Sequence, residues 1–193
     1  MNTGRLSQER PSKRTVALAG ATGLVGRSIL DGLLADTSVQ SVHVVARRKP
    51  RVVHGRLTCH IVDFAALPPL PPVDEVYLAL GTTIKVAGSQ PAFRAVDFDA
   101  NLAVARAALA AGARRCGLVS AMGANAKSKV FYNRVKGELE DALAQLAFEG
   151  LVTSRRFASA AASGLYPILP VSFPITRAKA FAGRFMKLCP ASG

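Results

Sequence analysis

The sequence predicts a single α/β domain with a doubly wound, mostly parallel sheet. Two observations carry this prediction: short apolar segments alternate with segments of helical periodicity, and the first apolar segment runs directly into a glycine-rich turn. At 193 residues the chain is long enough to bury a sizeable core. Half of the residues are hydrophobic, only 6% are aromatic and none is Trp, which favours a core of Val, Leu, Ala and Ile between helices and a parallel sheet.

Five apolar segments are predicted as buried strands, because each is short, rich in small or branched residues and bounded by turn residues. Apolar residues recur at helical spacing in three longer segments. The connections from the second to the third strand and from the third to the fourth are only about a dozen residues long, near the lower limit for a parallel crossover. We therefore expect irregular crossovers there. The strands are residues 15–20, 41–46, 59–64, 75–81 and 115–123, and the helices 24–35, 93–111 and 132–148.

The chain divides into three parts by composition. Residues 1–14 are predicted to be a basic disordered tail, residues 15–152 a dinucleotide-binding domain, and residues 153–193 a C-terminal segment that is either divergent or read in a shifted frame. A sixth strand is expected to begin after Gly150, but a serine–alanine stretch soon replaces its apolar run. No acidic residue follows Glu149, which marks the same boundary.

The formal net charge of +13 lies mostly in the two ends of the chain. Four basic residues stand against Glu9 in the first part, and six basic residues follow Glu149. A basic domain face would indicate a nucleic-acid partner, whereas basic ends around a nearly balanced domain do not, so we expect no nucleic-acid partner. The segment Pro174–Leu188 has the pattern of a basic amphipathic helix, which could contact an anionic membrane or pack on its own domain.

Cysteine use and the termini set the expected compartment. Cys59, Cys116 and Cys189 are odd in number and lack metal-like spacing, so we expect neither a disulfide framework nor a metal site. The N-terminus lacks the apolar stretch of a secretory signal, and no apolar run approaches the ~18 residues of a membrane span. We therefore expect a reduced, soluble, cytoplasmic protein that is a monomer or a homodimer.

The motif GATGLVG at residues 20–26 lies between a predicted strand and a predicted helix. A first glycine permits a tight turn, a second lets the backbone approach a pyrophosphate, and a third lets the helix pack close to the sheet. The free N–H groups at the start of the helix then face the phosphates. A purely structural turn is the alternative, but the strand–turn–helix context is that of a dinucleotide site. The sequence thus predicts a Rossmann-type domain that binds its cofactor with Gly20, Ala21, Thr22, Gly23, Leu24, Val25 and Gly26.

The end of the second strand indicates which dinucleotide is preferred. An acidic residue there would accept the ribose 2′-hydroxyl of NAD(H), whereas arginine accommodates the 2′-phosphate of NADP(H). Here Arg47 and Arg48 follow the strand, with Lys49, Arg51 and Arg56 after them and no carboxylate nearby. A solvated basic loop is the alternative. We predict a preference for NADP(H), with NAD(H) possible.

Four stretches carry a family resemblance: GATGLVG, VYLALGTT (76–83), VDFDANLAVARAALAAGARR (96–115) and GLVSAMGANAKSKVFYNRVKGELE (117–140). With them the chain resembles the atypical short-chain dehydrogenase/reductase superfamily, and within it the NAD(P)H-binding, epimerase-like oxidoreductases related to the HIV Tat-interactive protein. The resemblance implies that Asp63 and Phe64 border the adenine, although Asp63 could equally be a helix or turn cap. It also implies that the pyrophosphate and the nicotinamide ribose are lined by Leu80, Gly81, Thr82 and Thr83.

The last stretch holds the active-site pattern of that superfamily, a serine after the fifth strand followed by Y-x-x-x-K. Tyr132 and Lys136 are four apart on a predicted helix, so they share a face. The pKa of a free tyrosine is about 10, and a neighbouring ammonium would lower it towards neutral pH. The resemblance implies that Tyr132 is the general acid or base, that Lys136 also anchors the ribose, and that Ser120 stabilises the substrate oxygen.

Each of these residues also has a plain structural explanation. Tyr132 could pack on the sheet, and Lys136 could pair with Glu140 one turn further on. Asn101 stands where the family often has a water-binding asparagine, and a satisfied polar helix residue is equally plausible there. The alternatives predict the same fold.

The sequence therefore predicts an NADP(H)-dependent oxidoreductase that moves a hydride to or from a small carbonyl or alcohol substrate, whose identity stays open. The alternative is a non-catalytic NADP(H)-binding regulatory or redox-sensing protein, since one fold serves both. Sugar-nucleotide epimerisation would need a larger C-terminal substrate domain. In relatives an Arg-Pro pair follows the sixth strand and it is missing here, so the substrate half of the site is the less defined half.

Overall fold

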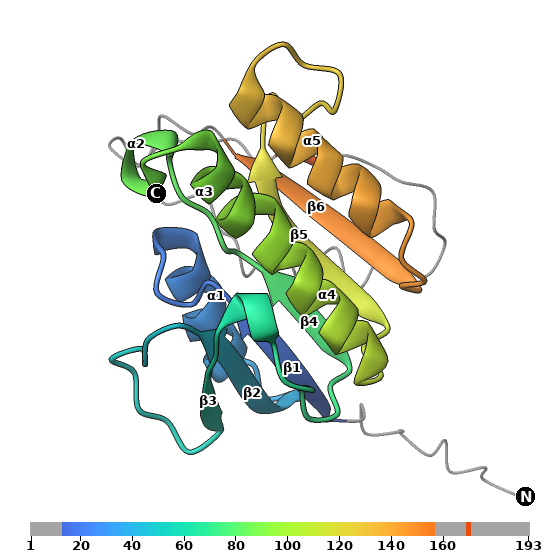
Figure 1. Ribbon diagram of the computed structural model, residues 1–193. Helices are drawn as coiled ribbons and strands as arrows, with labels where there is room; N and C mark the ends of the chain where they lie inside the picture. The colour runs from blue at the N-terminus through green and yellow to red at the C-terminus, as the bar shows by residue number, and fades with distance from the viewer. Residues whose placement is uncertain (1–12, 157–168, 171–193) are drawn as a thin grey trace, which may run out of the picture.

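The computed structural model describes residues 13–156 and 169–170. Its sheet has the order β3-β2-β1-β4-β5-β6-β7 (Figure 1). The first six strands along the chain run parallel, and β7 is antiparallel to β6. The strands are β1 (Arg14–Ala19), β2 (Val39–Ala46), β3 (Leu57–Ile61), β4 (Glu75–Leu78), β5 (Arg115–Ala121), β6 (Gly150–Arg156) and β7 (Leu169–Pro170).

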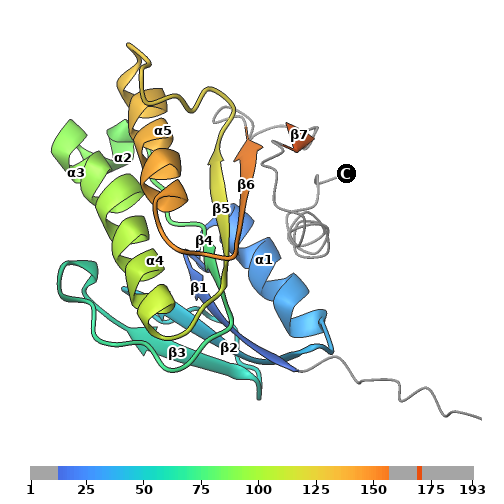
Figure 2. The ribbon, with the colours of Figure 1, turned by 90° about the vertical axis from the view of Figure 1, so that its right-hand side faces the viewer.

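Helices cover both faces of the sheet, as the prediction of a doubly wound α/β domain requires. α1 (Leu24–Ala35) lies on one face, and α4 (Asn101–Ala110) and α5 (Phe131–Ala144) lie on the other (Figure 2). The reversal of strand order between β1 and β4 is the Rossmann topology, which places ligands at the carboxyl ends of the strands. The shorter elements are η1 (Phe64–Ala66), α2 (Ile84–Ala87), α3 (Gln90–Arg94) and η2 (Ala95–Ala100).

Most predicted elements are confirmed, and two differ in a way that matters for the site. The helix predicted over 93–111 is one long run in which η2 is a π-helical stretch between α3 and α4. The sixth strand continues past position 152 to Arg156. The crossovers are irregular as expected: residues 47–56 join β2 to β3 without a helix, and η1 is the one helical turn between β3 and β4.

Two apolar clusters fill the spaces on the two faces of the sheet. α1 packs on one face because its apolar side chains recur at helical spacing, and three of them, Ile29, Leu30 and Leu33, are fully buried. On the other face, α4 and α5 cover the alternate residues of β4 and β5. The first cluster includes Val16, Leu18, Ile29, Leu30 and Leu33, and the second includes Val76, Leu118, Val104, Leu139 and Leu143.

The amino ends of the strands meet at a buried carboxylate, Glu75. Arg14 Nε and Arg115 Nε lie 3.1 and 2.9 Å from its two oxygens, and the Tyr77 hydroxyl lies 3.0 Å from one of them. Arg14 also pairs with Asp36 at 2.7 Å. Burial alone would raise the pKa of Asp36, but hydrogen bonds from Ser38 and Arg14 outweigh it and lower that pKa to about 2.

Several sequence predictions fall on residues that the structure does not describe. These are residues 1–12 of the predicted basic tail, the predicted amphipathic helix at 174–188 and Cys189, whereas Arg14, the last residue of the predicted tail, begins β1. Within the described residues, no helix is both long and apolar enough to cross a membrane. In the same residues, His, Cys, Asp and Glu form no group of three or more that could hold a metal ion.

Candidate dinucleotide cleft and active site

The glycine turn after β1 adopts a shape that only glycine tolerates at two positions. Gly20 has φ of 91°, and a Cβ atom there would lie 2.3 Å from the carbonyl carbon of Ala79. A Cβ atom on Gly26 would lie 1.9 Å from the Gly20 carbonyl oxygen. The first glycine therefore lets the turn pass against the end of β4, and the third lets α1 pack onto the turn, as the spacing predicts.

The second glycine faces open space. A Cβ atom on Gly23 would meet only the Gly20 carbonyl oxygen, at 3.5 Å. Gly23 is also the N-cap of α1, and no side chain caps the helix. The first-turn amides and the positive end of the helix dipole are thus left to interact with an anion in the cleft.

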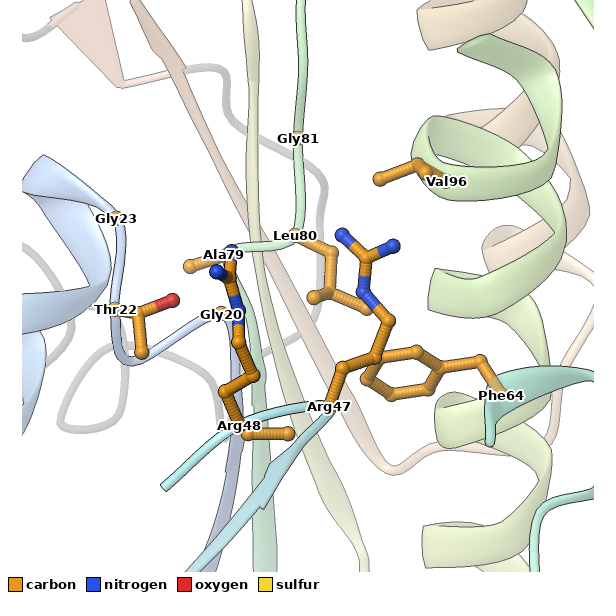
Figure 3. Close-up of a pocket in the computed structure, with 11 residues that line it drawn as sticks. Gly20, Thr22, Gly23, Arg47, Arg48, Phe64, Ala79, Leu80, Gly81 and Val96 are labelled. Atoms are coloured by element: carbon orange, nitrogen blue, oxygen red, sulfur yellow. The ribbon is translucent and has the colours of Figure 1, made fainter. Parts of the chain in front are cut away.

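A cleft opens between this turn, the end of β2 and the end of β4. Figure 3 shows Arg47 and Arg48 rising from the end of β2 into it, with Phe64 beside Arg47. Of the predicted cofactor residues, eight line the cleft together with three that the sequence reading did not include. The eight are Gly20, Thr22, Gly23, Arg47, Arg48, Phe64, Leu80 and Gly81, and the three are Ala46, Ala79 and Val96.

A second, strongly basic cavity adjoins the first and shares Thr22 and Arg48 with it. Lys49, Arg51 and Arg27 also line it. The sequence reading missed Arg27, although its place one residue after the last glycine of the motif puts it on the first turn of α1. Arg56 was named as part of the same basic run, yet its guanidinium turns away and donates to the carbonyl groups of three residues, Leu34, Asp36 and Val39.

Two predicted cofactor residues have structural roles instead. Asp63 is exposed and caps η1 by accepting the Ala65 amide at 2.9 Å, which is the alternative that the sequence left open. Thr83 caps α2 through the Val86 amide at 3.2 Å. Neither lines the cleft. Leu24, Val25 and Ala21 belong to the start of α1 and its turn, with Leu24 71% exposed, Val25 packed against the α1 cluster and Ala21 lining the second cavity.

Ser120 lies near the carboxyl end of β5 and is buried. It is on the face of the sheet that α5 covers, because its partner in the register, Arg155 of β6, pairs with Glu140 of α5. Within the described residues the Ser120 hydroxyl has no hydrogen-bond partner. An unpaired buried hydroxyl is costly, and such groups occur where a ligand or water completes them.

Lys136 does not pair with Glu140, the alternative that the sequence left open. Its ammonium lies 2.7 Å from Oδ1 of Asp97, a fully buried residue of η2. Both ends of this ion pair sit beneath Gly81: a Cβ atom on Gly81 would be 3.5 Å from Asp97 Oδ1 and 3.8 Å from Lys136 Nζ. Gly81 itself lines the cleft, so the ammonium of Lys136 lies just behind the cleft lining at that residue.

The pKa of Tyr132 is raised, whereas the sequence predicted that a neighbouring ammonium would lower it. Tyr132 is in the first turn of α5, with its ring 5.5 Å from that of Phe93. Burial raises the pKa of its phenol, and the carboxylate of Asp97 raises it further. The prediction depended on a free ammonium beside the phenol, but Asp97 pairs with the ammonium of Lys136. An acidic residue in the otherwise mostly apolar stretch around Asn101 was the available signal.

The amide nitrogen of Asn101 has a structural role. Its Nδ2 donates to the carbonyl groups of Leu80 and Asp97, each at 3.1 Å, and so ties η2 to the end of β4. Its Oδ1 is buried and has no partner within the described residues. The side chain is therefore half satisfied, which fits either expectation for it.

The curated relatives are fungal FMP52 proteins. The chain is 35% identical over 150 residues to a protein from Emericella nidulans, and 34% identical over 146 residues to one from Candida albicans, matching 72% of this chain in each case. No family model matches the sequence. The chain is an FMP52-like protein with a Rossmann-like fold. It spans 64% of the length of those two relatives.

Solved structures share the fold of this FMP52-like chain. The enzyme WbmG of Bordetella bronchiseptica, in complex with NAD, matches 77% of this chain and 54% of its own, with a TM-score of 0.60 and 14% identity. A short-chain dehydrogenase/reductase from Saccharomyces cerevisiae matches 66% of this chain and 62% of its own, with a TM-score of 0.53 and 16% identity. At these identities the likeness establishes the Rossmann-like fold.

The relatives also correct one prediction. The cytoplasmic location expected from the sequence is wrong by this comparison, because the FMP52 relatives are named mitochondrial proteins. The expectation depended on the lack of an apolar secretory signal. Mitochondrial targeting signals are basic and amphipathic instead, so that test could not detect them.

Proposed function

We propose that this FMP52-like protein is an NADP(H)-dependent oxidoreductase that acts on a small carbonyl or alcohol substrate. The observation that carries the proposal is the position of Lys136 directly beneath Gly81 of the dinucleotide cleft, one helical turn from Tyr132. A lysine and a tyrosine at helical spacing, beside a cleft with a glycine turn and an uncapped helix, are the parts that this chemistry needs.

The residues of the cleft fit a dinucleotide. Gly23 and the first turn of α1 would hold the pyrophosphate, because the glycine leaves room and the amides there have no side-chain cap. Arg47 follows β2 and Phe64 begins η1 after β3, and the two side chains lie beside each other where an adenosine belongs in this fold (Figure 3). WbmG, which shares the fold, is described in complex with NAD, which supports a nicotinamide dinucleotide.

The positive charge around the second cavity supports the preference for NADP(H). The cavity next to the cleft is lined by the four cations Arg27, Arg48, Lys49 and Arg51, and Arg48 lines both spaces. A 2′-phosphate placed between them would gain charge-assisted hydrogen bonds that a 2′-hydroxyl cannot make. All four side chains are exposed, so the phosphate would reach them without burying an unpaired charge.

The chain's own residues account for the proton and the orientation of the substrate. A nicotinamide, when bound, supplies or takes up the hydride. Tyr132 would exchange a proton with the substrate oxygen as general acid or base. The unpaired Ser120 hydroxyl would donate a hydrogen bond to the same oxygen, and so become satisfied itself. Lys136 would hold the ribose at the Gly81 end of the cleft.

Binding and turnover test the two parts of this proposal separately. We expect titration of NADPH into the protein, followed by nicotinamide fluorescence, to give tighter binding than NADH. Arg48→Ala should weaken NADPH binding about tenfold or more and leave NADH binding almost unchanged, because only the phosphate loses a charged partner. Arg106→Ala, an exposed arginine of α4, is the matched control. Equal affinities of the wild type for the two cofactors would contradict the preference, and no binding would contradict the function.

Tyr132→Phe tests the chemistry. The variant should lose carbonyl-dependent NADPH oxidation and keep NADPH affinity close to that of the wild type, since Tyr132 is not one of the described residues that line the cleft. Full activity in the variant would remove Tyr132 from the mechanism.

A non-catalytic NADP(H)-binding regulator is the second candidate, and one observation favours it. The ammonium of Lys136 is engaged by a buried carboxylate rather than left free for Tyr132. A wild type that binds NADPH tightly but oxidises it with no member of a carbonyl panel would support this candidate over the enzyme.

A further inference from the structure

Asp97 connects α5 to the end of β4 from a fully buried position. Its Oδ1 lies 2.7 Å from the ammonium of Lys136 on α5, and its Oδ2 accepts the backbone amide of Thr82, which follows β4, at 2.8 Å. Asp97 lies in η2, a π-helical stretch inside a long helix, and such stretches frequently occur at functional sites. One carboxylate therefore holds α5 and the end of β4 to the same point of η2.

Gly81 of the cleft is held to η2 on both sides (Figure 3). The residue before it, Leu80, accepts the amide nitrogen of Asn101 at 3.1 Å, and the backbone amide of the residue after it donates to Asp97. A Cβ atom on Gly81 would lie 3.5 Å from Asp97 Oδ1 and 3.8 Å from Lys136 Nζ. Because glycine has no side chain, no Cβ separates the ammonium from this part of the cleft lining.

Lys136 needs a partner to remain in this place. Its side chain is only 7% exposed, and a buried ammonium without a partner is costly. The ion pair with Asp97 removes that cost and occupies one of the three N–H donors of the ammonium. Two donors are left for a ligand, and adjacent hydroxyl groups of a ribose can accept them.

The nearby acidic residues of α5 have other partners. Glu138 pairs with Arg94 of α3, and Glu140 pairs with Arg155 of β6. Among the described residues, Asp97 is the only one whose carboxylate forms an ion pair with Lys136. The position of the ammonium therefore depends on Asp97.

We propose that Asp97 is a positioning residue for the cofactor: it holds the ammonium of Lys136 behind Gly81, so that the two remaining N–H donors are in place for the hydroxyl groups of the nicotinamide ribose. The proposal rests on the proposed function, in which Lys136 holds that ribose. Asp97 itself touches no cofactor atom and acts only through Lys136. Its effect is therefore confined to the nicotinamide half of the cofactor, whereas the adenosine half depends on the glycine turn and on the arginines after β2.

Two ligands divide the cofactor into these halves. NADPH carries the nicotinamide ribose, whereas adenosine 2′,5′-bisphosphate carries only the adenosine and two phosphates. We expect Asp97→Asn to weaken NADPH binding about tenfold, because the ammonium loses its charged partner, and to leave the affinity for the bisphosphate within about twofold of the wild type. Isothermal titration calorimetry measures both affinities. Asp99→Asn, at an exposed position of η2, is the matched control and should bind both ligands as the wild type does.

The substitution separates a positioning role from a purely structural one. Asparagine still offers an oxygen to the Thr82 amide, so the contact between η2 and the end of β4 can persist while the charge beside Lys136 is lost. Equal weakening of both ligands in Asp97→Asn, or unchanged affinity for both, would overturn the proposal. A wild type that does not bind NADPH would contradict the proposed function as well.

A second comparison covers the case in which Asp97→Asn does not fold, since it leaves a buried ammonium unpaired. Lys136→Met removes the anchor of the ribose, and Lys136→Met with Asp97→Asn removes both charges. If Asp97 acts only through Lys136, these two variants should bind NADPH equally within about twofold, each about tenfold more weakly than the wild type. A further loss in the double variant would overturn the proposal. Wild-type affinity in Lys136→Met would remove Lys136 as the anchor and the proposal with it.

Discussion

The two ends of the parallel sheet treat buried polar groups in opposite ways. At the amino end, Glu75 is fully buried and contacts two guanidinium groups and a hydroxyl, so each of its oxygens is satisfied. At the carboxyl end, Ser120 Oγ and Asn101 Oδ1 are buried and have no partner among the described residues, and Asp97 pairs with one ammonium. The first arrangement holds strands together, and the second leaves groups available to a ligand.

The contrast shows how to tell a structural charge from a functional one in this fold. Both carboxylates are inaccessible to solvent, so burial does not distinguish them. The surroundings do: both oxygens of Glu75 contact guanidinium or hydroxyl groups, whereas Asp97 lies beneath the glycine that lines the cleft. Perturbation should therefore affect stability at one end and chemistry at the other.

The largest effect is expected at the amino end. Glu75→Gln removes the charge that Arg14 and Arg115 share, and Arg14 is almost fully buried. Removing one partner of a buried pair typically costs about 3–5 kcal/mol. We expect the free energy of unfolding, measured by urea denaturation, to fall by that amount, with NADPH affinity of the folded fraction unchanged.

The matched control is Glu149→Gln. Glu149 pairs with Arg114 at 3.4 Å, but both side chains are more than half exposed. Exposed pairs contribute about 1 kcal/mol or less, so this variant should unfold almost as the wild type does. Equal losses in the two variants would mean that the amino-end network is no more structural than a surface pair.

The next largest effect is expected on turnover at the carboxyl end. Ser120→Ala deletes a buried hydroxyl that has no partner, so the free energy of unfolding should stay the same or rise slightly. If the hydroxyl orients the substrate oxygen, kcat should fall about a hundredfold. Loss of stability together with unchanged kcat would place Ser120 with the structural groups instead.

Ser154→Ala is the control for that experiment. Ser154 is also fully buried with an unpaired hydroxyl, but it lies on β6 beside Val119, which packs in the α1 cluster on the other face of the sheet. Its removal should leave kcat unchanged. If kcat falls in Ser120→Ala and not in Ser154→Ala, the loss depends on where the buried hydroxyl lies and not on its burial alone.

A smaller effect is expected in the glycine turn. Substitutions of Gly23 and Gly26 should separate the residue that the cofactor needs from the residue that the fold needs. Gly23→Ala should cost about 1 kcal/mol or less of stability, because Gly23 has an extended conformation and open space around it. NADPH affinity should fall about tenfold as the new methyl group meets the pyrophosphate. Gly26→Ala should instead lower the unfolding temperature markedly, since its Cβ would overlap the Gly20 carbonyl. Unchanged NADPH affinity in Gly23→Ala would contradict the proposed position of the pyrophosphate.

The features of this molecule that could be predicted from the sequence are those set by residues close to one another along the chain. The glycine motif constrains the backbone within seven residues, so its turn, the strand before it and the helix 24–35 could all be predicted. Arg47 and Arg48 follow a strand end and enter the cleft for the same local reason. The family resemblance predicted both Phe64 and Asp63 as cofactor residues. Phe64 lines the cleft, whereas Asp63 caps η1 instead.

The catalytic half could be predicted only as a set of residue types. The positions of Ser120, Tyr132 and Lys136 follow a motif, but their electrostatics depend on Asp97, which is remote in sequence and comes from another element. Nothing in the helical spacing of 93–111 indicated that its middle would be a π-helix. The sequence therefore predicts the residue types of this half of the site, but not the buried carboxylate that pairs with Lys136.

The smallest effect is expected at the β2–β3 edge, far from both ends. His43 Nδ1 and His60 Nε2 lie 2.9 Å apart, so one imidazole donates to the other. Burial and the neighbouring His60 lower the pKa of His43 below its ordinary value of 6.5. Because the folded protein holds this group neutral, its contribution to stability is present above about pH 6.5 and is lost as the pH falls below that value.

We expect the free energy of unfolding to decrease between pH 7 and pH 5, and to decrease less in His43→Phe. His54→Gln removes the third histidine, an exposed one, and should keep the wild-type slope. Comparing slopes among the three proteins cancels the titration of Asp97 and of every other shared carboxylate, so an identical slope in His43→Phe would exclude the histidine pair as its source.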